Sequence, residues 1–467
     1  MVMRMNYEEF LKSKQIRQTN SGFDIRLDQM NPQMFEWQKS VVRWALRKGK
    51  CALFEECGLG KTIQQLEFAN QVQLHCKQPV LILAPLAVAD QTRREGAKFG
   101  YNVTICRSQA EVVNGINITN YEMIEHFDPS MFCAVILDES SILKHHTSKT
   151  RECLTAAFAN TPYKLCCTAT PAPNDFSELG NHAEFLGIMS RTEMLATFFV
   201  HDGGDTSKWR LKHHAESKFF EWIASWACCM TSPADLGYDA DAYVLPPLDI
   251  IEHTVKSPII EDDNGQERLF AGVSATLSER RAARKSSLQG RIETAAKLAN
   301  AYDGQCLVWC DYNDESELAA KKIDGAVEVR GTDTPEHKKN SMIGFSEGEV
   351  RCLVSKPSIA GWGMNWQNCN KVIFAGLSDS FESYYQAVRR CWRFGQLEPV
   401  EVHLIISEAE GAVKTNIEKK QATADRMTKE LVRFTKEILQ EDIKSTVRIT
   451  DRYIATQPML VPHWIGG

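Results

Sequence analysis

The chain has 467 residues, of which 43% are hydrophobic and 24% are charged, so it can bury large cores and form two or three domains. Its formal net charge of −6 excludes a uniformly basic coat, and any contact with nucleic acid must come from local patches. The 15 cysteines include no CxxC pair, which favours buried reduced thiols over a zinc site. No apolar run has the length of a signal peptide or a membrane span, so we expect a soluble intracellular protein.

Residues 1–31 form a polar segment in which a short strand is expected over Phe23 to Arg26. A helix is expected from Pro32, and it carries Gln38 just after two aromatic side chains, Phe35 and Trp37. A glutamine with an aromatic neighbour can read an adenine, because the amide pairs with the base edge while the ring stacks. The alternative is that these residues belong to the surface and core of an ordinary helix.

The segment EECGLGKT, residues 55–62, stands between an apolar run, Cys51 to Phe54, and a helix-forming run, Ile63 to Val72. A strand, a glycine turn and a helix start in this order aim backbone N–H groups at one point, which suits a polyphosphate. Lys61 would reach its terminal phosphates, and the Thr62 hydroxyl would hold Mg²⁺. The alternative is a glycine turn that caps a helix.

Apolar strands then alternate with helices, and a polar motif follows each strand. Alternation of this kind predicts a parallel sheet with helices on both faces, and ligands in such sheets bind at the carboxyl ends of the strands. The expected strands are residues 80–84, 103–106, 115–121, 133–137 and 165–167.

Asp138 and Glu139 end one of these strands, where one carboxylate can hold Mg²⁺ while the other accepts a proton from the attacking water. The alternative is that they cap the following helix. Thr168 and Thr170 end the next strand and either link the site to a second lobe or serve as turn hydroxyls.

From residue 175 to about 287 the alternation fades. Residues 207–218, SKWRLKHHAESK, are basic with an aromatic inserted, which suits either a nucleic-acid backbone or a solvated helix face. Residues 231–247 are rich in turn formers and indicate a connection.

A second unit of strands and helices follows, with strands expected at 305–310, 327–329, 351–355 and 371–375. Gly361 and Gly363 mark a tight turn after the third strand. Residues 383–396 are expected to form one helix, on which Gln386, Arg390 and Arg393 share a side with Arg389. Such arginines either form a surface ion-pair face or bind phosphate oxygens from a facing lobe.

Six segments, in this order, resemble the motifs of helicase superfamily 2 motors of the SWI/SNF type, and more closely the compact versions of bacteriophages and prophages. EECGLGKT is similar to DEMGLGKT, LAPLAV to the second motif, and LDESSILKHHTSK to the DEGHRIKN box. CTATPAPN resembles LTGTPxQN, SKPSIAGWGMNW resembles STKAGGLGLNL, and QAVRRCWRFGQ resembles QAxDRAHRIGQ.

The resemblance implies an α/β protein with two tandem RecA-like parallel-sheet lobes, helical insertions between them and a C-terminal helical brace. We therefore expect an N-terminal segment at 1–31, lobe 1 with a protrusion at 32–240, a linker at 241–287, lobe 2 at 288–408 and the brace at 409–467.

The resemblance also implies a DNA-dependent ATPase that uses ATP and Mg²⁺, and it assigns roles to individual residues. The nucleotide-binding set is Gln38, Glu55, Glu56, Cys57, Gly58, Leu59, Gly60, Lys61 and Thr62, with Thr62 and Asp138 on the metal. The catalytic set is Lys61, Glu139, Gln386, Arg390 and Arg393, the last two as arginine fingers. Coupling falls to Thr168, Thr170, Gly361 and Gly363, and nucleic-acid contact to Pro85, Leu86, Thr119, Asn120, Ser355, Lys208 and Arg210.

Some positions depart from the family pattern. Glu55 and Cys57 replace Asp and Met, and Arg389 and Trp392 replace Asp and His. Ser140 and Ser141 likewise replace Gly and His. These changes remove no catalytic group, but they lie where nucleic-acid binding communicates with hydrolysis.

The resemblance favours an ATP-driven translocase on double-stranded DNA, monomeric when free, in the cytoplasm of a bacterial or phage-infected cell and without membrane contact. Two alternatives stay open: a strand-separating helicase on branched DNA or RNA, and a nucleotide-dependent binding subunit of a restriction or defence complex.

Overall fold

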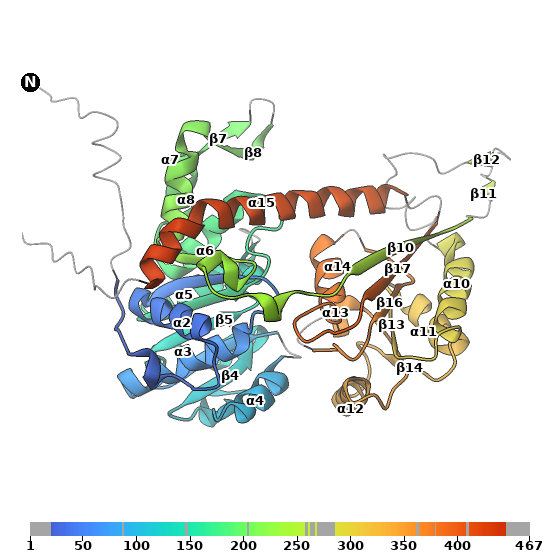
Figure 1. Ribbon diagram of the computed structural model, residues 1–467, viewed down its shortest axis with the longest axis horizontal. Helices are drawn as coiled ribbons and strands as arrows, with labels where there is room; N and C mark the ends of the chain where they lie inside the picture. The colour runs from blue at the N-terminus through green and yellow to red at the C-terminus, as the bar shows by residue number, and fades with distance from the viewer. Residues whose placement is uncertain are drawn as a thin grey trace, which may run out of the picture.

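The computed structural model describes residues 20–85, 88–144, 148–202, 205–256, 260–261, 267–268, 285–360, 364–378, 380–407 and 411–444. Two parallel sheets dominate this part of the chain, each at the centre of its own lobe, and a long helix extends along both lobes (Figure 1). This arrangement confirms the predicted fold class of two parallel-sheet α/β lobes. The predicted strand at Phe23 to Arg26 is wrong, because these residues precede a short 3₁₀ turn, η1 (Leu27–Gln29).

Lobe 1 is built on a 7-stranded sheet in the order β3-β4-β2-β5-β6-β1-β9. Its neighbouring strands all pair in parallel. The strands are β1 (Lys50–Glu55), β2 (Val80–Ala84), β3 (Val103–Ile105), β4 (Ile116–Asn120), β5 (Ala134–Asp138), β6 (Tyr163–Thr168) and β9 (Ala227–Met230). The covering helices include α2 (Glu36–Lys48), α3 (Lys61–Cys76), α4 (Ala89–Lys98) and α5 (Lys149–Ala157).

The middle of the chain forms a protrusion on lobe 1 (Figure 1). Its elements are α6 (Leu179–Leu186), α7 (Arg191–Phe198), β7 (Phe199–Asp202), β8 (Asp205–Leu211) and α8 (Glu216–Ala224). The basic segment that was expected either to bind nucleic acid or to form a helix face begins in the antiparallel β7–β8 hairpin. The helical interpretation of residues 207–211 is therefore wrong, and alternation of Trp209 with polar residues fits the observed strand.

Lobe 2 is built on a 6-stranded sheet in the order β10-β17-β16-β13-β15-β14. Its strands are β10 (Leu248–Val255), β13 (Cys306–Trp309), β14 (Ala326–Val329), β15 (Cys352–Ser355), β16 (Lys371–Phe374) and β17 (Val400–Ser407). Its helices are α10 (Leu288–Asn300), α11 (Asn313–Lys322), α12 (Pro335–Ser346), α13 (Pro357–Ala360) and α14 (Phe381–Val388). β10 belongs to this sheet although it lies within the predicted linker.

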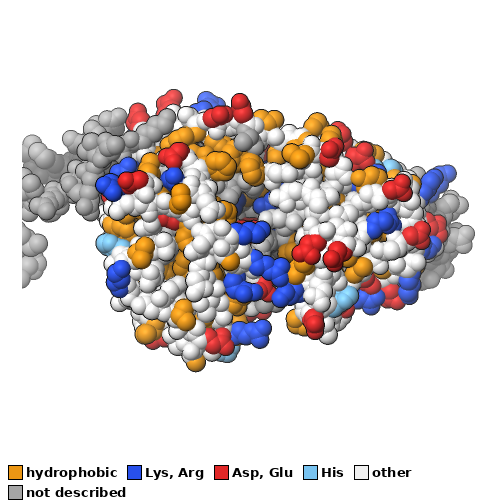
Figure 2. Space-filling view, turned by 60° about the horizontal axis from the view of Figure 1, so that its bottom comes forward, with side chains coloured by type: hydrophobic (Ala, Val, Ile, Leu, Met, Phe, Trp, Pro, Cys, Tyr) orange, Lys and Arg blue, Asp and Glu red, His pale blue; other side chains and the backbone are white. Residues whose placement is uncertain are grey.

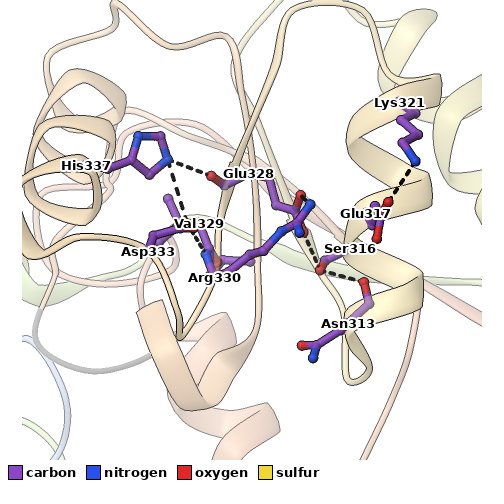
Figure 3. Close-up of polar contacts among 10 residues, drawn as sticks. Asn313, Ser316, Glu317, Lys321, Glu328, Val329, Arg330, Asp333 and His337 are labelled. Atoms are coloured by element: carbon purple, nitrogen blue, oxygen red, sulfur yellow. Dashed lines mark hydrogen bonds and ion pairs between the residues drawn. The ribbon is translucent and has the colours of Figure 1, made fainter.

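Polar contacts at the end of β14 fix the start of α12 (Figure 3). The Ser316 hydroxyl of α11 donates to Glu328 Oε1 at 2.6 Å, and Arg330 pairs with the same carboxylate. His337 Nε2 donates to the Glu328 carbonyl at 3.0 Å. These bonds tie α12 to β14, the edge strand of the sheet.

The last described element is α15 (Gly411–Lys444), which packs on both lobes. Ile417 belongs to the core of lobe 2, whereas Leu431 and Leu439 belong to the two core clusters of lobe 1. Among the helices of the described residues, none has the length and hydropathy needed to cross a membrane.

Candidate functional site

The phosphate loop lies between β1 and α3, where the sequence predicts it. Gly58 and Gly60 adopt φ angles of 90° and 77°, a region that a residue with a Cβ rarely enters. Lys61 begins α3, and its ammonium donates to the carbonyls of Glu55 at 2.7 Å and Glu56 at 3.1 Å. The first turn of α3 holds no acidic residue, so the N-terminal end of the helix stays favourable for an anion.

Gln38 reaches this loop from α2. Its amide donates to the Leu59 carbonyl at 3.0 Å, and its Oε1 accepts from the backbone N–H of Phe35 at 3.1 Å. A Cβ on Gly60 would lie 2.5 Å from the Gln38 amide nitrogen, so glycine is required there for this close approach. The predicted adenine-reading helix and the phosphate loop are therefore in direct contact.

Asp138 and Glu139 end β5 and face the loop. Asp138 Oδ1 accepts from the Gln65 amide of α3 at 2.7 Å, so its side chain does not cap a helix. Glu139 has a φ angle of 53°, and Thr168 donates to its Oε2 at 3.4 Å. Burial, together with the charge of Asp138, raises the pKa of Glu139 to about 7.

The arginines of lobe 2 enter the same site. The positive charges of Lys61 and Arg390 both lower the pKa of Glu139, against the effect of burial. One carboxyl group therefore interacts electrostatically with a cation from each lobe. Arg390 Nη2 donates to Gln386 Oε1 at 2.8 Å, and its Nη1 donates to the Met364 carbonyl at 3.2 Å. Arg393 bonds to Asn365, and burial lowers its pKa to about 10, which leaves it charged at neutral pH.

The predicted single helix over residues 383–396 is wrong, because α14 ends at Val388. The carbonyl of Arg390 accepts from the backbone N–H of Trp366 at 2.9 Å, so it cannot continue the helical ladder. Arg390 and Arg393 therefore reach the site from a turn after the helix, while Gln386 remains on α14.

Sequence reasoning missed the ion pair between Arg389 and the phosphate loop. Arg389 Nη2 lies 2.6 Å from Glu56 Oε1, and the Tyr385 hydroxyl also donates to this carboxylate. The sequence held one signal for this ion pair. Position 389 carries Arg where the family pattern has Asp, and an arginine can pair with a carboxylate of the opposite lobe.

Two further contacts that the sequence did not indicate also join the lobes. Lys144, after the Asp138 box, pairs with Glu382 at the start of α14. Asn365 donates to Glu95 Oε1 on α4 at 3.1 Å while its own Oδ1 accepts from Arg393. Motif spacing carries no information about such non-local pairs.

Residues predicted for coupling and nucleic-acid contact are placed as follows. Thr168 Oγ1 accepts from the backbone N–H of Thr170 at 3.1 Å, directly beside Glu139. Thr119 is buried at the end of β4, and Asn120 caps the following turn. Ser355 is buried and donates to the Val329 carbonyl. Pro85 follows β2 and Arg210 is exposed on β8, whereas Leu86, Gly361, Gly363 and the side chain of Lys208 lie outside the described residues.

Buried hydrogen-bond donors that have no acceptor make this site suitable for binding an anion. Among the described residues, Gln386 Nε2 and Arg393 Nε are buried and have no hydrogen-bond acceptor. Phosphate oxygens would satisfy such donors, which is the chemistry expected of a triphosphate held between Lys61 and the lobe 2 arginines. Thr62 and Asp138 supply oxygen ligands of the kind that Mg²⁺ prefers.

Comparison with known families finds two matches. Residues 37–200 match the SNF2-related domain, and residues 290–395 match the helicase conserved C-terminal domain. Together the two matched regions account for more than half of the chain.

Similar curated proteins include chromodomain-helicase-DNA-binding protein 6 of Homo sapiens, 27% identical over 210 residues, which are 39% of this chain and 7% of that protein. Chromodomain-helicase-DNA-binding protein 8 of Xenopus tropicalis is 28% identical over 202 residues, which are 36% of this chain and 9% of that protein. The chain thus spans less than a tenth of the length of these relatives.

Among solved structures, the Sulfolobus solfataricus SWI2/SNF2 ATPase core in complex with dsDNA is 18% identical. The match covers 90% of this chain and 98% of that chain, with a TM-score of 0.42.

Proposed function

Because this chain belongs to the SWI/SNF type of helicase superfamily 2, whose members are DNA-dependent ATPases, we propose that it hydrolyses ATP between its lobes and thereby moves along double-stranded DNA. The observation that carries this proposal is that the lobe 2 segment with Arg390 and Arg393 lies against the phosphate loop of lobe 1. Its Arg389 Nη2 lies 2.6 Å from Glu56 Oε1 of the loop, and a Cβ on Gly58 would lie 2.9 Å from the backbone nitrogen of Phe394.

In the proposed reaction, Lys61 and the phosphate loop bind the triphosphate, and Thr62 and Asp138 would hold a Mg²⁺ that offsets the phosphate charge. Glu139 is the general base for the attacking water. Its pKa of about 7 suits this role, since a base is most effective when its pKa lies near the working pH. Arg390 and Arg393 stabilise the charge on the transferred phosphoryl group.

Hydrolysis would drive movement because the arginines and the phosphate loop lie on different lobes. ATP that contacts both lobes binds the closed arrangement more tightly than the open one. Loss of the terminal phosphate removes this difference in binding free energy, so the lobes reopen. If each lobe holds the DNA backbone, one cycle of closing and opening becomes one step.

A basic surface between the lobes supports DNA as the polymer. Figure 2 shows Lys and Arg side chains gathered around the hollow between the lobes. Exposed arginines on α4, Arg93 and Arg94, lie on the lobe 1 side, and Lys339 on α12 is close enough to contribute to the lowered pKa of Asp90 on α4. Positive side chains from both lobes fit a phosphate backbone that spans them.

The test is ATP turnover without polynucleotide and with single-stranded, duplex and forked DNA, with Glu139→Gln as the inactive control. We expect duplex DNA to stimulate turnover most, with no displacement of the strands. Strand displacement from a fork would favour the helicase alternative, and nucleic-acid binding without any change in turnover would favour the binding-subunit alternative.

A further inference from the structure

Tyr243 lies at the end of a short turn, η9 (Asp241–Tyr243), in the connection between the lobes. Three aromatic rings surround it. Their centroids lie 5.9 Å away for Phe35, 5.8 Å for Trp37 and 4.8 Å for Phe394. The Trp37 indole N–H donates to the Tyr243 hydroxyl at 3.2 Å, which fixes the tyrosine ring against α2.

These rings come from different parts of the candidate site. Phe35 and Trp37 lie just before Gln38, whose amide bonds to the phosphate loop. Phe394 directly follows Arg393 and packs on the loop, since a Cβ on Gly58 would lie 2.9 Å from the Phe394 backbone nitrogen. Tyr243 thus touches both the predicted adenine-reading segment and the segment that carries an arginine finger.

The angles between the rings show which contacts cover a face of Tyr243. Phe35 and Trp37 meet it edge to face, with interplanar angles of 68° and 77°. Phe394 lies across it at 32°, closer to a stacked arrangement. A flat aromatic face beside a glutamine and a phosphate loop is the surface on which a purine base stacks.

We propose that Tyr243 is the stacking platform for the adenine of ATP, and that the base takes the place of the Phe394 ring on it. This inference rests on the proposed ATPase function and adds a residue outside the recognised motifs to it. Arrival of the base moves Phe394, and Arg393 moves with it because the two residues are adjacent. The connection between the lobes therefore links recognition of the base to placement of the finger.

The test measures binding of Mg·ADP and of tripolyphosphate to the full chain by calorimetry. Tyr243→Ala should weaken Mg·ADP binding roughly tenfold, because one base–aromatic contact is lost. It should leave tripolyphosphate binding unchanged, because that probe has no base. Tyr243→Phe keeps the ring and should restore Mg·ADP binding. Phe394→Ala should tighten Mg·ADP binding, because it removes the competing ring.

Tyr238→Phe is the matched control. Tyr238 lies in the same connection, and its hydroxyl donates to Ser40 of α2 at 2.9 Å. This change should leave the affinities for both probes as they are. Equal effects of Tyr243→Ala on the two probes, or weaker Mg·ADP binding by Phe394→Ala, would overturn the inference.

Failure of this inference is distinguishable from failure of the ATPase proposal. Unchanged Mg·ADP binding in a Tyr243→Ala protein that still shows DNA-stimulated turnover overturns only the role of Tyr243. Absence of turnover in the unaltered chain with every polynucleotide overturns the ATPase proposal itself. Tyr243→Leu, which keeps an apolar side chain without an aromatic face, guards against misfolding of the alanine variant and should behave like it.

Discussion

Glu139 combines a strained backbone with a buried carboxyl group. A φ angle of 53° in a glutamate costs about 1–3 kcal/mol, which the surrounding structure must offset. In this conformation the carboxylate accepts a hydrogen bond from Thr168, and the charge of Lys61 lowers its pKa. Strain of this kind is frequent at functional sites, and here it falls on the proposed base.

The pKa of Glu139 predicts a pH dependence. Burial and Asp138 favour the neutral carboxyl, so Glu139 is protonated below about pH 7 and ionised above it. A general base must be ionised, so kcat/KM for ATP with duplex DNA should rise with pH and level off above this value. A steady-state pH profile checks this, and a profile that is flat or falls between about pH 6 and about pH 8 would contradict the role of Glu139.

Arg389 stabilises the contact between the lobes through Glu56. Burial raises the pKa of Glu56, but the Arg389 charge and the Tyr385 hydroxyl outweigh it, so the pKa is lowered and the carboxylate stays ionised. Arg389→Ala should cost about 1–3 kcal/mol of stability, because a largely buried charge loses its partner. In a Glu56→Gln background the same change should cost less. Equal losses in both backgrounds, measured by thermal unfolding, would show that the pair is not coupled.

At the scale of elements, the sequence predicts the parts of the site that depend on local order. Strand, turn and helix follow one another around Lys61 in the expected order, and Asp138 and Thr168 stand at the ends of strands β5 and β6. The end of α14 was not predictable, because it depends on the backbone of Trp366, which is distant in sequence from Arg390. Tyr243 and Phe394 are also distant in sequence, so no local sequence pattern indicates their contact.

Helix α4 connects exposed basic residues of lobe 1 to the proposed arginine finger. It carries the exposed Arg93 and Arg94, and its Glu95 accepts from Asn365, which in turn accepts from Arg393. Glu95→Ala should therefore lower the stimulation of turnover by duplex DNA on the order of tenfold, with little change in the KM for ATP. Glu152→Ala, an exposed glutamate on α5 outside this chain of bonds, is the control. Equal stimulation in the Glu95 variant and the unaltered protein would exclude this route.

Helix α15 is anchored to lobe 1 by Asp442. Its carboxylate accepts from the Trp44 indole at 2.8 Å and pairs with Lys48 at 2.8 Å, both on α2. Asp442→Ala should lower the free energy of unfolding by about 1–3 kcal/mol, because both partners are buried and lose their acceptor. Thermal unfolding checks this against Glu437→Ala, an exposed position on α15 that should change little.

In the part of the molecule that the structure describes, several connections hold the lobes in one arrangement. They include the connection that contains Tyr243, the ion pairs of Glu56 and Lys144 with lobe 2, the hydrogen bond between Asn365 and Glu95, and helix α15 along both lobes (Figure 1). The expected C-terminal brace agrees with α15. Any closing motion of the lobes must preserve or exchange these contacts, so the ion pairs are the groups whose partners we expect to change during a cycle.

The central claim is that the phosphate-loop lysine and the lobe 2 arginines act on one triphosphate. Its most direct test is the turnover number of Arg393→Ala at saturating ATP and duplex DNA, compared with Arg426→Ala, which removes an exposed arginine from α15. We expect a loss on the order of 10³-fold for Arg393→Ala, as for other arginine fingers, and no loss for the control. Turnover of Arg393→Ala equal to that of the unaltered protein would contradict the claim.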